Sequence, residues 1–434
     1  MTLTDSDPIS ALDRGDHAGA ITLSLAGCGL TALPDSLRAL SGSLRVLDLA
    51  GNRLTALPHW LSEFTELRVL FGSANPFAAL PEVLGACPAL SQIGFRGCGM
   101  THLPPAALPP ALRWLTLTDN ALTELPASLG ERGDLRKLLL AGNRLRTLPE
   151  AMAAAAGLEL VRISANAFDS LPGWLPRLPR LAWLAWGGNP AESVSVQACQ
   201  PRTVRWTDLV LGPRLGEGSS GEVHEVDWPR GEPAGPVVLK LFKGHVSSDG
   251  LTQREIDAAL AVGDADGLIG GLAGLAGHPR QRPGLLMPRV APHWRVLGGP
   301  PSPSSCTRDV YPPDRRFTLA QMASIATRVG RGAAALHRAG YAHGDLYAHN
   351  ILYDPQGSGA RLGDLGAASA LPHDPVWAVP DLRAWAILAE ELLDRCPEPW
   401  PEARALVSSC LTGSADELVA LGDAVCALAA LTPP

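Results

Sequence analysis

The ten residues HGDLYAHNIL, at positions 343–352, place an aspartate, Asp345, five positions before an asparagine, Asn350. In phosphoryl transfer, an aspartate in such a loop accepts the proton of the attacking hydroxyl, and the asparagine holds a metal ion beside it. A second aspartate, Asp364, follows in the run LGDLG, fourteen residues after Asn350. This order predicts a phosphotransfer loop in which Asp345 is catalytic and Asn350 and Asp364 bind the metal.

A glycine-rich stretch lies upstream, after an expected strand at 208–212. Gly216, Gly218, Gly221 and Val223 fit the pattern G-x-G-x-x-G-x-V. Glycines let a backbone approach phosphate groups, and the free N–H groups donate to them. Alone, the pattern also fits an ordinary glycine-rich hairpin, so its weight depends on the residues downstream of it.

A lysine and a carboxylate come next in the chain. Lys240 is the one charged residue of the apolar run VVLKLF at 237–242, which we expect to be a strand. A helix is expected over 253–260, and its Glu255 is the best candidate to pair with Lys240. Asp257 is the second candidate, and a solvated helix face is the alternative for both.

Together these parts resemble the protein kinase superfamily over roughly residues 205–430. The resemblance implies that the glycine loop covers the phosphates of ATP and that Lys240, aimed by Glu255, grips them. It also implies that Asn350 and Asp364 bind Mg²⁺ and that this ion contacts the phosphates. The run PGLLMPRV at 283–290 then corresponds to the strand and hinge behind the adenine, which implies that Met287 and Arg289 bind ATP. An ordinary buried strand is the alternative there.

The match departs from the protein kinase pattern in several places. Gly344 stands where many protein kinases carry an arginine, and Tyr347 where serine/threonine kinases carry a lysine near the γ-phosphate. Leu365 replaces a phenylalanine, and no Ala-Pro-Glu follows Asp364. Asp381, which resembles the aspartate that begins the central helix of the C-terminal lobe, comes early. The lobe that carries the protein substrate is therefore expected to be shortened.

The first two hundred residues are internal repeats. Asparagine recurs at 52, 75, 120, 143, 166 and 189, and Cys28 and Cys98 occupy the same register, with spacings of 22 to 24 residues. The surrounding frame, as in LRVLDLAGNRLTALP at 44–58, resembles leucine-rich repeats, L-x-x-L-x-L-x-x-N/C-x-L. The asparagine is expected to hydrogen-bond backbone groups in the turn, and one repeat buries its leucines only against its neighbours. Asp7 can N-cap a short helix from Pro8 in a terminal cap.

The positions that point out of the expected strands suggest a binding surface. Six residues before each Asn or Cys the chain carries mostly apolar side chains, Trp114 and Trp183 among them, and a neighbouring column adds Phe71. Exposed aromatic side chains favour a protein partner on the concave face. The alternative is that these side chains pack on adjacent strands.

Composition limits the remaining classes. The chain has 434 residues, 46% hydrophobic and 18% charged, with a net charge of −7, which argues against nucleic acid as a partner. Its eight cysteines form no C-x-x-C pair, which indicates reduced thiols and no zinc site. The chain shows no signal peptide and no span, so a cytoplasmic protein is expected. The Ala, Gly, Pro and Arg bias is typical of a GC-rich, bacterial genome.

We therefore predict a two-domain chain. Residues 1–200 form an α/β leucine-rich repeat solenoid of seven to eight repeats with an N-terminal cap. Residues 201–434 form an α+β bilobal protein-kinase-like fold. The predicted function is ATP- and Mg²⁺-dependent phosphorylation of Ser/Thr hydroxyls on a protein recruited by the repeats. Two alternatives stay open: a small-molecule phosphotransferase of the aminoglycoside or choline kinase type, and a non-catalytic scaffold with a kinase fold.

Overall fold

The computed structural model describes residues 8–192, 202–218, 220–229, 235–244, 250–357 and 359–433. Its contacts divide the chain into two compact units. The first is Met1–Val161 with Asn166–Pro172, and the second is Arg162–Ala165 with Gly173–Pro434. This division follows contacts, whereas the boundary near residue 200 follows the repeat pattern. We call the residues 162–165 and 173–192, which group with the second unit, the terminal repeat segment.

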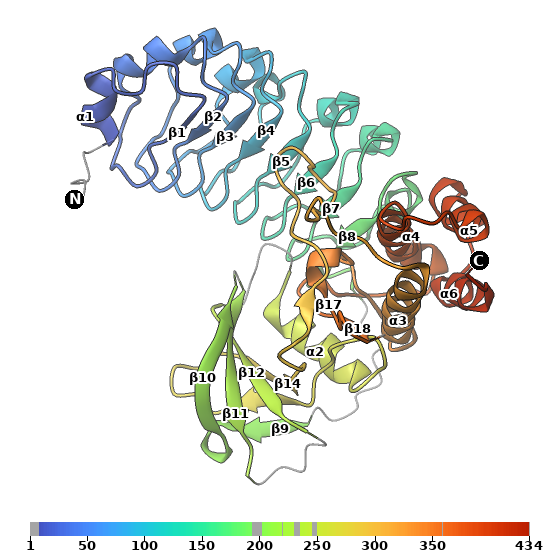
Figure 1. Ribbon diagram of the computed structural model, residues 1–434. Coiled ribbons are helices and arrows are strands. Elements are labelled where there is room, and N and C mark those ends of the chain that lie inside the picture. The colour runs from blue at the N-terminus through green and yellow to red at the C-terminus, as the bar shows by residue number, and fades with distance from the viewer. Residues whose placement is uncertain are drawn as a thin grey trace. The chain divides into compact units, whose positions relative to one another are not determined.

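The repeats give one parallel sheet of short strands in chain order, preceded by α1 (Pro8–Asp13) (Figure 1). The strands within the described residues are β1 (Thr22–Ser24), β2 (Val46–Asp48), β3 (Val69–Phe71), β4 (Gln92–Gly94), β5 (Trp114–Thr116), β6 (Lys137–Leu139), β7 (Leu160–Arg162) and β8 (Trp183–Ala185). Short 3-10 helices alternate with them: η1 (Asp35–Leu40), η2 (His59–Glu63), η3 (Glu82–Ala86), η4 (Pro105–Ala107), η5 (Ala127–Glu131), η6 (Glu150–Ala154) and η7 (Leu175–Arg177).

The asparagine register explains why the repeats stack. The Asn52 side-chain amide donates to Leu25 O and Leu49 O, both at 2.8 Å, and its carbonyl oxygen accepts from Leu30 N–H at 3.0 Å. Each such side chain therefore ties its own turn to the preceding repeat. Cys98 keeps the same place, with its sulfur 3.4 Å from Gly72 O. The predicted solenoid, including the role of the asparagines, is confirmed.

The second unit begins with a mixed six-stranded sheet, in the order β10-β11-β12-β14-β13-β9, drawn in green and yellow in Figure 1. The elements are β9 (Thr203–Arg205), η8 (Trp206–Asp208), β10 (Val210–Glu217), β11 (Gly221–Asp227), β12 (Val237–Phe242), α2 (Thr252–Val262), β13 (Ala273–Ala276) and β14 (Gly284–Pro288). Val226, Leu239 and Leu286 form part of the core on one face of this sheet. The strand expected at 237–242 and the helix expected at 253–260 are confirmed.

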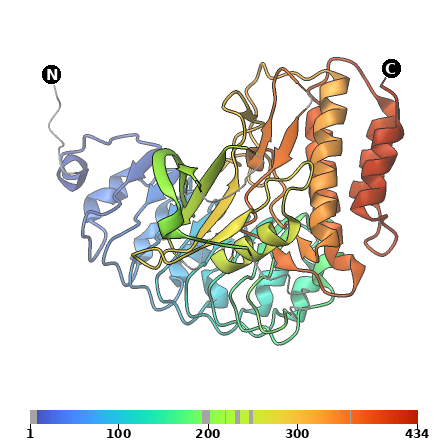
Figure 2. The same cartoon turned by 90° about the horizontal axis from the view of Figure 1, so that it is seen from below.

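Small sheets and helices complete this unit. The remaining elements are β15 (Arg295–Val296), α3 (Leu319–Arg338), β16 (Tyr341–Ala342), η9 (Ala348–Asn350), β17 (Ile351–Tyr353), β18 (Ala360–Leu362), β19 (Ser369–Ala370), η10 (Pro375–Ala378), α4 (Val379–Leu393), α5 (Pro401–Thr412) and α6 (Leu421–Ala430). Thr318 and Gln321 form a capping box that begins α3. Helices α3 and α6 pack side by side (Figure 2). A mixed sheet followed by helices confirms the kinase-like fold class.

Some sequence predictions fall outside the described residues. The proposed cap residue Asp7 and the predicted domain boundary between residues 200 and 201 are among them.

Candidate phosphotransfer site

The lysine and the glutamate singled out from the sequence lie together. Lys240 Nζ on β12 is 2.5 Å from Glu255 Oε1 on α2, and their side chains are only 12% and 6% exposed. Val223 of β11 lies opposite Lys240 in the antiparallel register. A buried ammonium needs a paired carboxylate, and Glu255 is the residue of α2 that provides it. Asp257 instead lies 3.4 Å from Arg254.

The glycine-rich stretch forms the hairpin that joins β10 to β11. Gly218 N–H donates to Gly221 O at 2.9 Å. A Cβ placed on Gly216 or Gly218 would meet no atom within 4 Å, so a ligand has room beside these two glycines. A Cβ on Gly221 would instead lie 2.6 Å from Leu241 O on β12. Close strand packing therefore explains the third glycine, and phosphate contact remains a prediction for the first two.

The expected hinge residues have partners within the sheet. Met287 pairs with Val238 in the β12–β14 register. The Arg289 N–H donates to Pro236 O at 2.8 Å, and its guanidinium is 2.7 Å from Glu225 Oε1. Arg289 therefore already uses its backbone donor and its charge inside the protein, and of these two residues Met287 is the better candidate for an adenine contact.

The residues of the predicted catalytic loop, 343–352, hold one another in place. The Asn350 side-chain amide donates to Asp345 O at 2.9 Å and to Asp345 Oδ2 at 2.8 Å. The Asp345 N–H donates to His343 Nδ1 at 3.1 Å. This arrangement fixes the carboxylate of Asp345 and leaves the Asn350 amide oxygen pointing elsewhere, where an oxygen-seeking metal can use it.

A buried aspartate supports the loop by accepting hydrogen bonds from its backbone. Asp381, at the start of α4, accepts from His343 N–H at 2.7 Å and from Gly344 N–H at 2.9 Å, and lies 2.8 Å from His337 Nε2. Burial is the largest single effect and opposes its charge, but the hydrogen bond and charge of His337 together with the contacts to His343 outweigh it, and the pKa of Asp381 falls below its ordinary value.

His343 braces the loop through both of its ring nitrogens. Burial lowers the pKa of His343, which keeps the ring neutral. In the matching tautomer, Nε2–H donates to Gly363 O at 3.1 Å while Nδ1 accepts from Asp345 N–H. Both ring nitrogens are thus occupied in holding the backbone of the loop.

Asp364 lies at a strained turn near the lysine pair. Its φ is 53°, and its Oδ1 accepts from Gly366 N–H at 3.2 Å. A Cβ on Gly366 would lie 3.1 Å from Asp364 Oδ1 and 3.6 Å from Glu255 Oε2. The two carboxylates therefore border the same point, which places the predicted metal ligand Asp364 near the Lys240–Glu255 pair.

The residues present fit a nucleotide with a divalent ion. Within the described residues, no cluster of three or more His, Cys, Asp or Glu side chains can hold a metal by itself. Asn350 and Asp364 supply oxygens for only part of a shell, which suits Mg²⁺ because that ion keeps waters and phosphate oxygens as its other ligands.

Sequence reasoning missed Asp309, which shapes the loop. Asp309 is buried, accepts from Ala348 N–H at 2.5 Å and lies 2.7 Å from His349 Nδ1. Burial is the largest single effect and lowers the pKa of His349, but the hydrogen bond and charge of Asp309 together with the charges of Asp345 and Asp364 outweigh it and raise the pKa overall. Asp309 comes from the Pro- and Ser-rich stretch between the expected hinge and α3, and no local pattern distinguishes it there.

Trp183 was expected on an exposed partner surface, but the structure buries it. Its ring stacks on Tyr347 with centroids 4.3 Å apart and planes 4° apart, and its Nε1–H donates to Leu346 O at 3.0 Å. This tryptophan packs within the second unit, so its assignment to the partner face is wrong for this structure. Phe71 and Trp114 are both half-buried; Phe71 lies against Gly94 of the next strand, and Trp114 carries Lys137 Nζ 4.1 Å from its ring centre.

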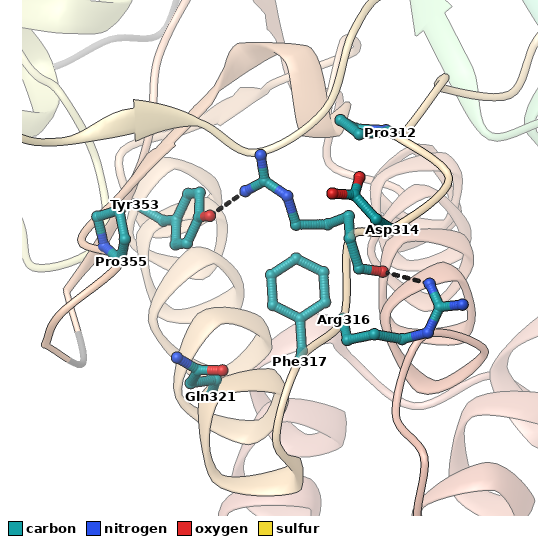
Figure 3. A pocket seen from close by; sticks show the side chains of 8 residues that line it. Pro312, Asp314, Arg316, Phe317, Gln321, Tyr353 and Pro355 are labelled. Atoms are coloured by element: carbon teal, nitrogen blue, oxygen red, sulfur yellow. Dashed lines mark hydrogen bonds between the residues drawn. The ribbon is translucent and has the colours of Figure 1, made fainter.

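A shallow pocket of about 590 Å³ lies at the start of α3, and none of the predicted site residues lines it (Figure 3). Its walls include Arg315, Arg316, Phe317 and Tyr353. Arg315 donates to the Tyr353 hydroxyl, and Arg316 donates to Arg315 O at 2.9 Å. Oxygen atoms of the protein thus already accept hydrogen bonds from both arginines of the pocket.

Comparison with known proteins supports the division into repeats and a kinase-like part. The model described as Lipopolysaccharide kinase (Kdo/WaaP) family matches residues 311–382, a stretch that holds Asp345, Asn350, Asp364 and Asp381. The Leucine Rich Repeat model matches residues 43–64. No curated protein matches the chain.

The fold and these matches support a protein in which leucine-rich repeats are joined to a kinase-like domain. In general terms, they also support a kinase-fold phosphotransferase. Among the described residues, no helix is both long enough and apolar enough to cross a membrane.

Proposed function

We propose that the second unit transfers the γ-phosphoryl group of ATP, with Mg²⁺, to a hydroxyl group of a protein, with serine and threonine as the acceptors. The observation that carries this proposal is the joint presence of the Lys240–Glu255 ion pair and the fixed Asp345–Asn350 pair. Phosphoryl transfer needs positioning and charge neutralisation more than covalent chemistry, and these pairs supply both.

Each residue has a separate task in this proposal. Lys240 holds the phosphates, and Glu255 keeps the ammonium of Lys240 charged and directed. Asp345 accepts a hydrogen bond from the acceptor hydroxyl and then takes its proton. Asn350 and Asp364 hold the divalent ion, which neutralises charge on the phosphate oxygens when it is bound. Gly216 and Gly218 leave space over the phosphates.

The repeats support a protein as the acceptor. A solenoid presents an extended surface, and Phe71 and Trp114 give it half-buried aromatic side chains. The cytoplasm is the compartment in which ATP would meet such a partner.

Transfer from γ-labelled ATP tests the proposal, with the chain itself and a generic protein as acceptors. We expect Mg²⁺-dependent labelling that Asp345→Asn lowers by about 10²- to 10⁴-fold. Lys240→Met should abolish it as well. Asp266→Asn serves as the matched control, because Asp266 pairs with Arg328 and is mostly exposed. Labelling that persists in Asp345→Asn would remove the basis for its assigned role.

A saccharide acceptor is the second candidate, and the lipopolysaccharide kinase match favours it. Two features agree with it: Asp364 and Asp381 are only seventeen positions apart, and Asp345 has a side chain only 16% exposed. A panel of lipopolysaccharide saccharides and aminoglycosides, run beside the protein acceptor, separates the two candidates. Transfer to a saccharide without transfer to protein would overturn the protein proposal and retain the phosphotransferase.

A further inference from the structure

One arginine of the repeats lies on the catalytic loop. Arg162 ends β7, four residues before the repeat asparagine Asn166, and groups with the second unit. Its guanidinium donates to Gly344 O at 2.9 Å and forms an ion pair with Asp345 Oδ1. The Arg162 side chain is only 1% exposed, so a full positive charge is buried against the predicted catalytic carboxylate.

The catalytic loop has no basic residue at the two positions, 344 and 347, where the resemblance to protein kinases implies one. Gly344 replaces an arginine and Tyr347 replaces a lysine. The structure explains the first replacement: Gly344 has φ of 71°, and a Cβ there would lie 2.6 Å from Leu184 O of β8. The terminal repeat segment occupies the space that a side chain at position 344 would need. Tyr347, in turn, is stacked under Trp183.

We infer that Arg162 is a positioning residue for phosphotransfer and replaces, from the repeat sequence, the cation that the loop lacks. It holds one oxygen of Asp345 while Asn350 holds the other, so that the carboxylate has a single orientation. Its charge also offsets the negative charge that Asp345 brings next to the phosphates. This inference rests on the proposed function of the Asp345 site.

A second residue of the terminal repeat segment contacts helix α2, which carries Glu255. Glu192 is buried, and its carboxylate lies 2.8 Å from Arg254 Nε and accepts from Ala370 N–H at 2.7 Å. Arg254 directly precedes Glu255 on α2. The same segment therefore fixes the catalytic loop through Arg162 and the helix that carries the partner of Lys240 through Glu192.

The full-length chain with substitutions at Arg162 tests the inference. We expect Arg162→Gln to lower kcat about 100-fold while the KM for ATP stays within about threefold, because ATP contacts are untouched. Arg162→Lys keeps the charge but loses the planar guanidinium. Its kcat should lie between those of the wild type and Arg162→Gln, about tenfold below the wild type. This graded recovery separates an effect of charge and geometry from simple loss of folding.

Arg136→Gln is the matched control. Arg136 pairs with Glu159 at 2.5 Å within the first unit, whereas the catalytic loop belongs to the second. The control should leave kcat unchanged. Amide hydrogen exchange over residues 343–347 provides a readout independent of activity: exchange should rise in Arg162→Gln and not in Arg136→Gln.

Each outcome bears on the inference. Equal kcat in wild type and Arg162→Gln would overturn it while the proposed function stands. Higher kcat in Arg162→Gln would also overturn it, by showing that the ion pair blocks Asp345. Absence of transfer in the wild type would overturn the proposed function and the catalytic role of Arg162 together, and faster exchange alone would then show only a structural contact.

Discussion

The early repeats and the terminal repeat segment share one sequence frame, yet the same columns serve different purposes. Four residues before the asparagine, Asp48 in an early repeat accepts from Ala50 N–H at 3.0 Å and caps its own turn. Arg162 stands in that column and pairs with Asp345. Six residues before the asparagine, Trp114 donates to Thr116 Oγ1 at 2.9 Å on its own strand, whereas Trp183 donates to Leu346 O in the predicted catalytic loop.

This difference shows that the repeat frame determines the backbone while the surroundings determine the role of each outward side chain. The inward leucines, and the asparagines in the repeats that carry them, have the same stacking role along the array. The outward columns are free to vary, and in the terminal repeat segment they became part of the core of another fold. Substitutions in matched columns test this interpretation.

The largest effect is expected from the tryptophan column. Trp183→Ala removes a fully buried ring and leaves Leu346 O without its donor, and should lower the free energy of unfolding by about 3–5 kcal/mol. Trp114→Ala, in the same column but half-buried, should cost about 1 kcal/mol. Urea titration of both variants measures the difference. Equal losses would mean that the two columns are not used differently.

A smaller effect, dependent on pH, should come from the second unit. Burial first, and then the charge of Asp309, raise the pKa of Glu391 to about 7, although Tyr311 donates to it at 3.1 Å and Arg308 and Arg395 lie near. A carboxyl with a raised pKa favours folding while it is protonated. Its contribution is therefore complete below about pH 4.5 and is lost as the pH rises through 7.

Glu391→Gln should remove this loss. The variant should match the wild type near pH 4.5 and exceed it above pH 7, by at most about 3 kcal/mol, since one pKa unit corresponds to about 1.4 kcal/mol. Thermal unfolding of both proteins between pH 4.5 and 8 provides the measurement. A constant difference across that range would show that Glu391 does not titrate with folding. Glu63→Gln is the control, because Glu63 in an early repeat is half exposed beside Arg38.

Most of the fold was predictable because its signals are local and repeated. The asparagine register predicted the solenoid, and the strand at 237–242 and the helix at 253–260 followed from their apolar patterns. The pairing of Lys240 with Glu255 was also predictable, because the resemblance to protein kinases implies a helix carboxylate as the partner of the strand lysine.

The rest of the site depends on contacts between residues far apart in sequence. Arg162 and Asp345 are separated by 183 positions, and nothing in the local frame distinguishes Arg162 from other outward residues. Trp183 was predicted to be an exposed aromatic because its neighbours in the column are outward, and only the three-dimensional contact with Tyr347 corrects this. Gly344 was a departure from a motif in the sequence, and the carbonyl of Leu184 gives the reason.

The smallest effect is expected from an exposed arginine in another column of the repeats. Arg146 pairs with Asp169 at 3.2 Å, but the two side chains are 76% and 71% exposed. Water screens this pair, so Arg146→Ala should change the free energy of unfolding by less than about 0.5 kcal/mol, and raising the salt concentration should not change that result. Arg162→Ala removes the partner of a carboxylate that is largely withdrawn from water, and should be clearly destabilising in the same titration. Both arginines come from the repeats, but Arg146 is exposed beside another repeat residue, whereas Arg162 is buried against Asp345 of the second unit. A large effect at Arg146, or none at Arg162, would mean that burial does not decide the role of an outward side chain in these repeats.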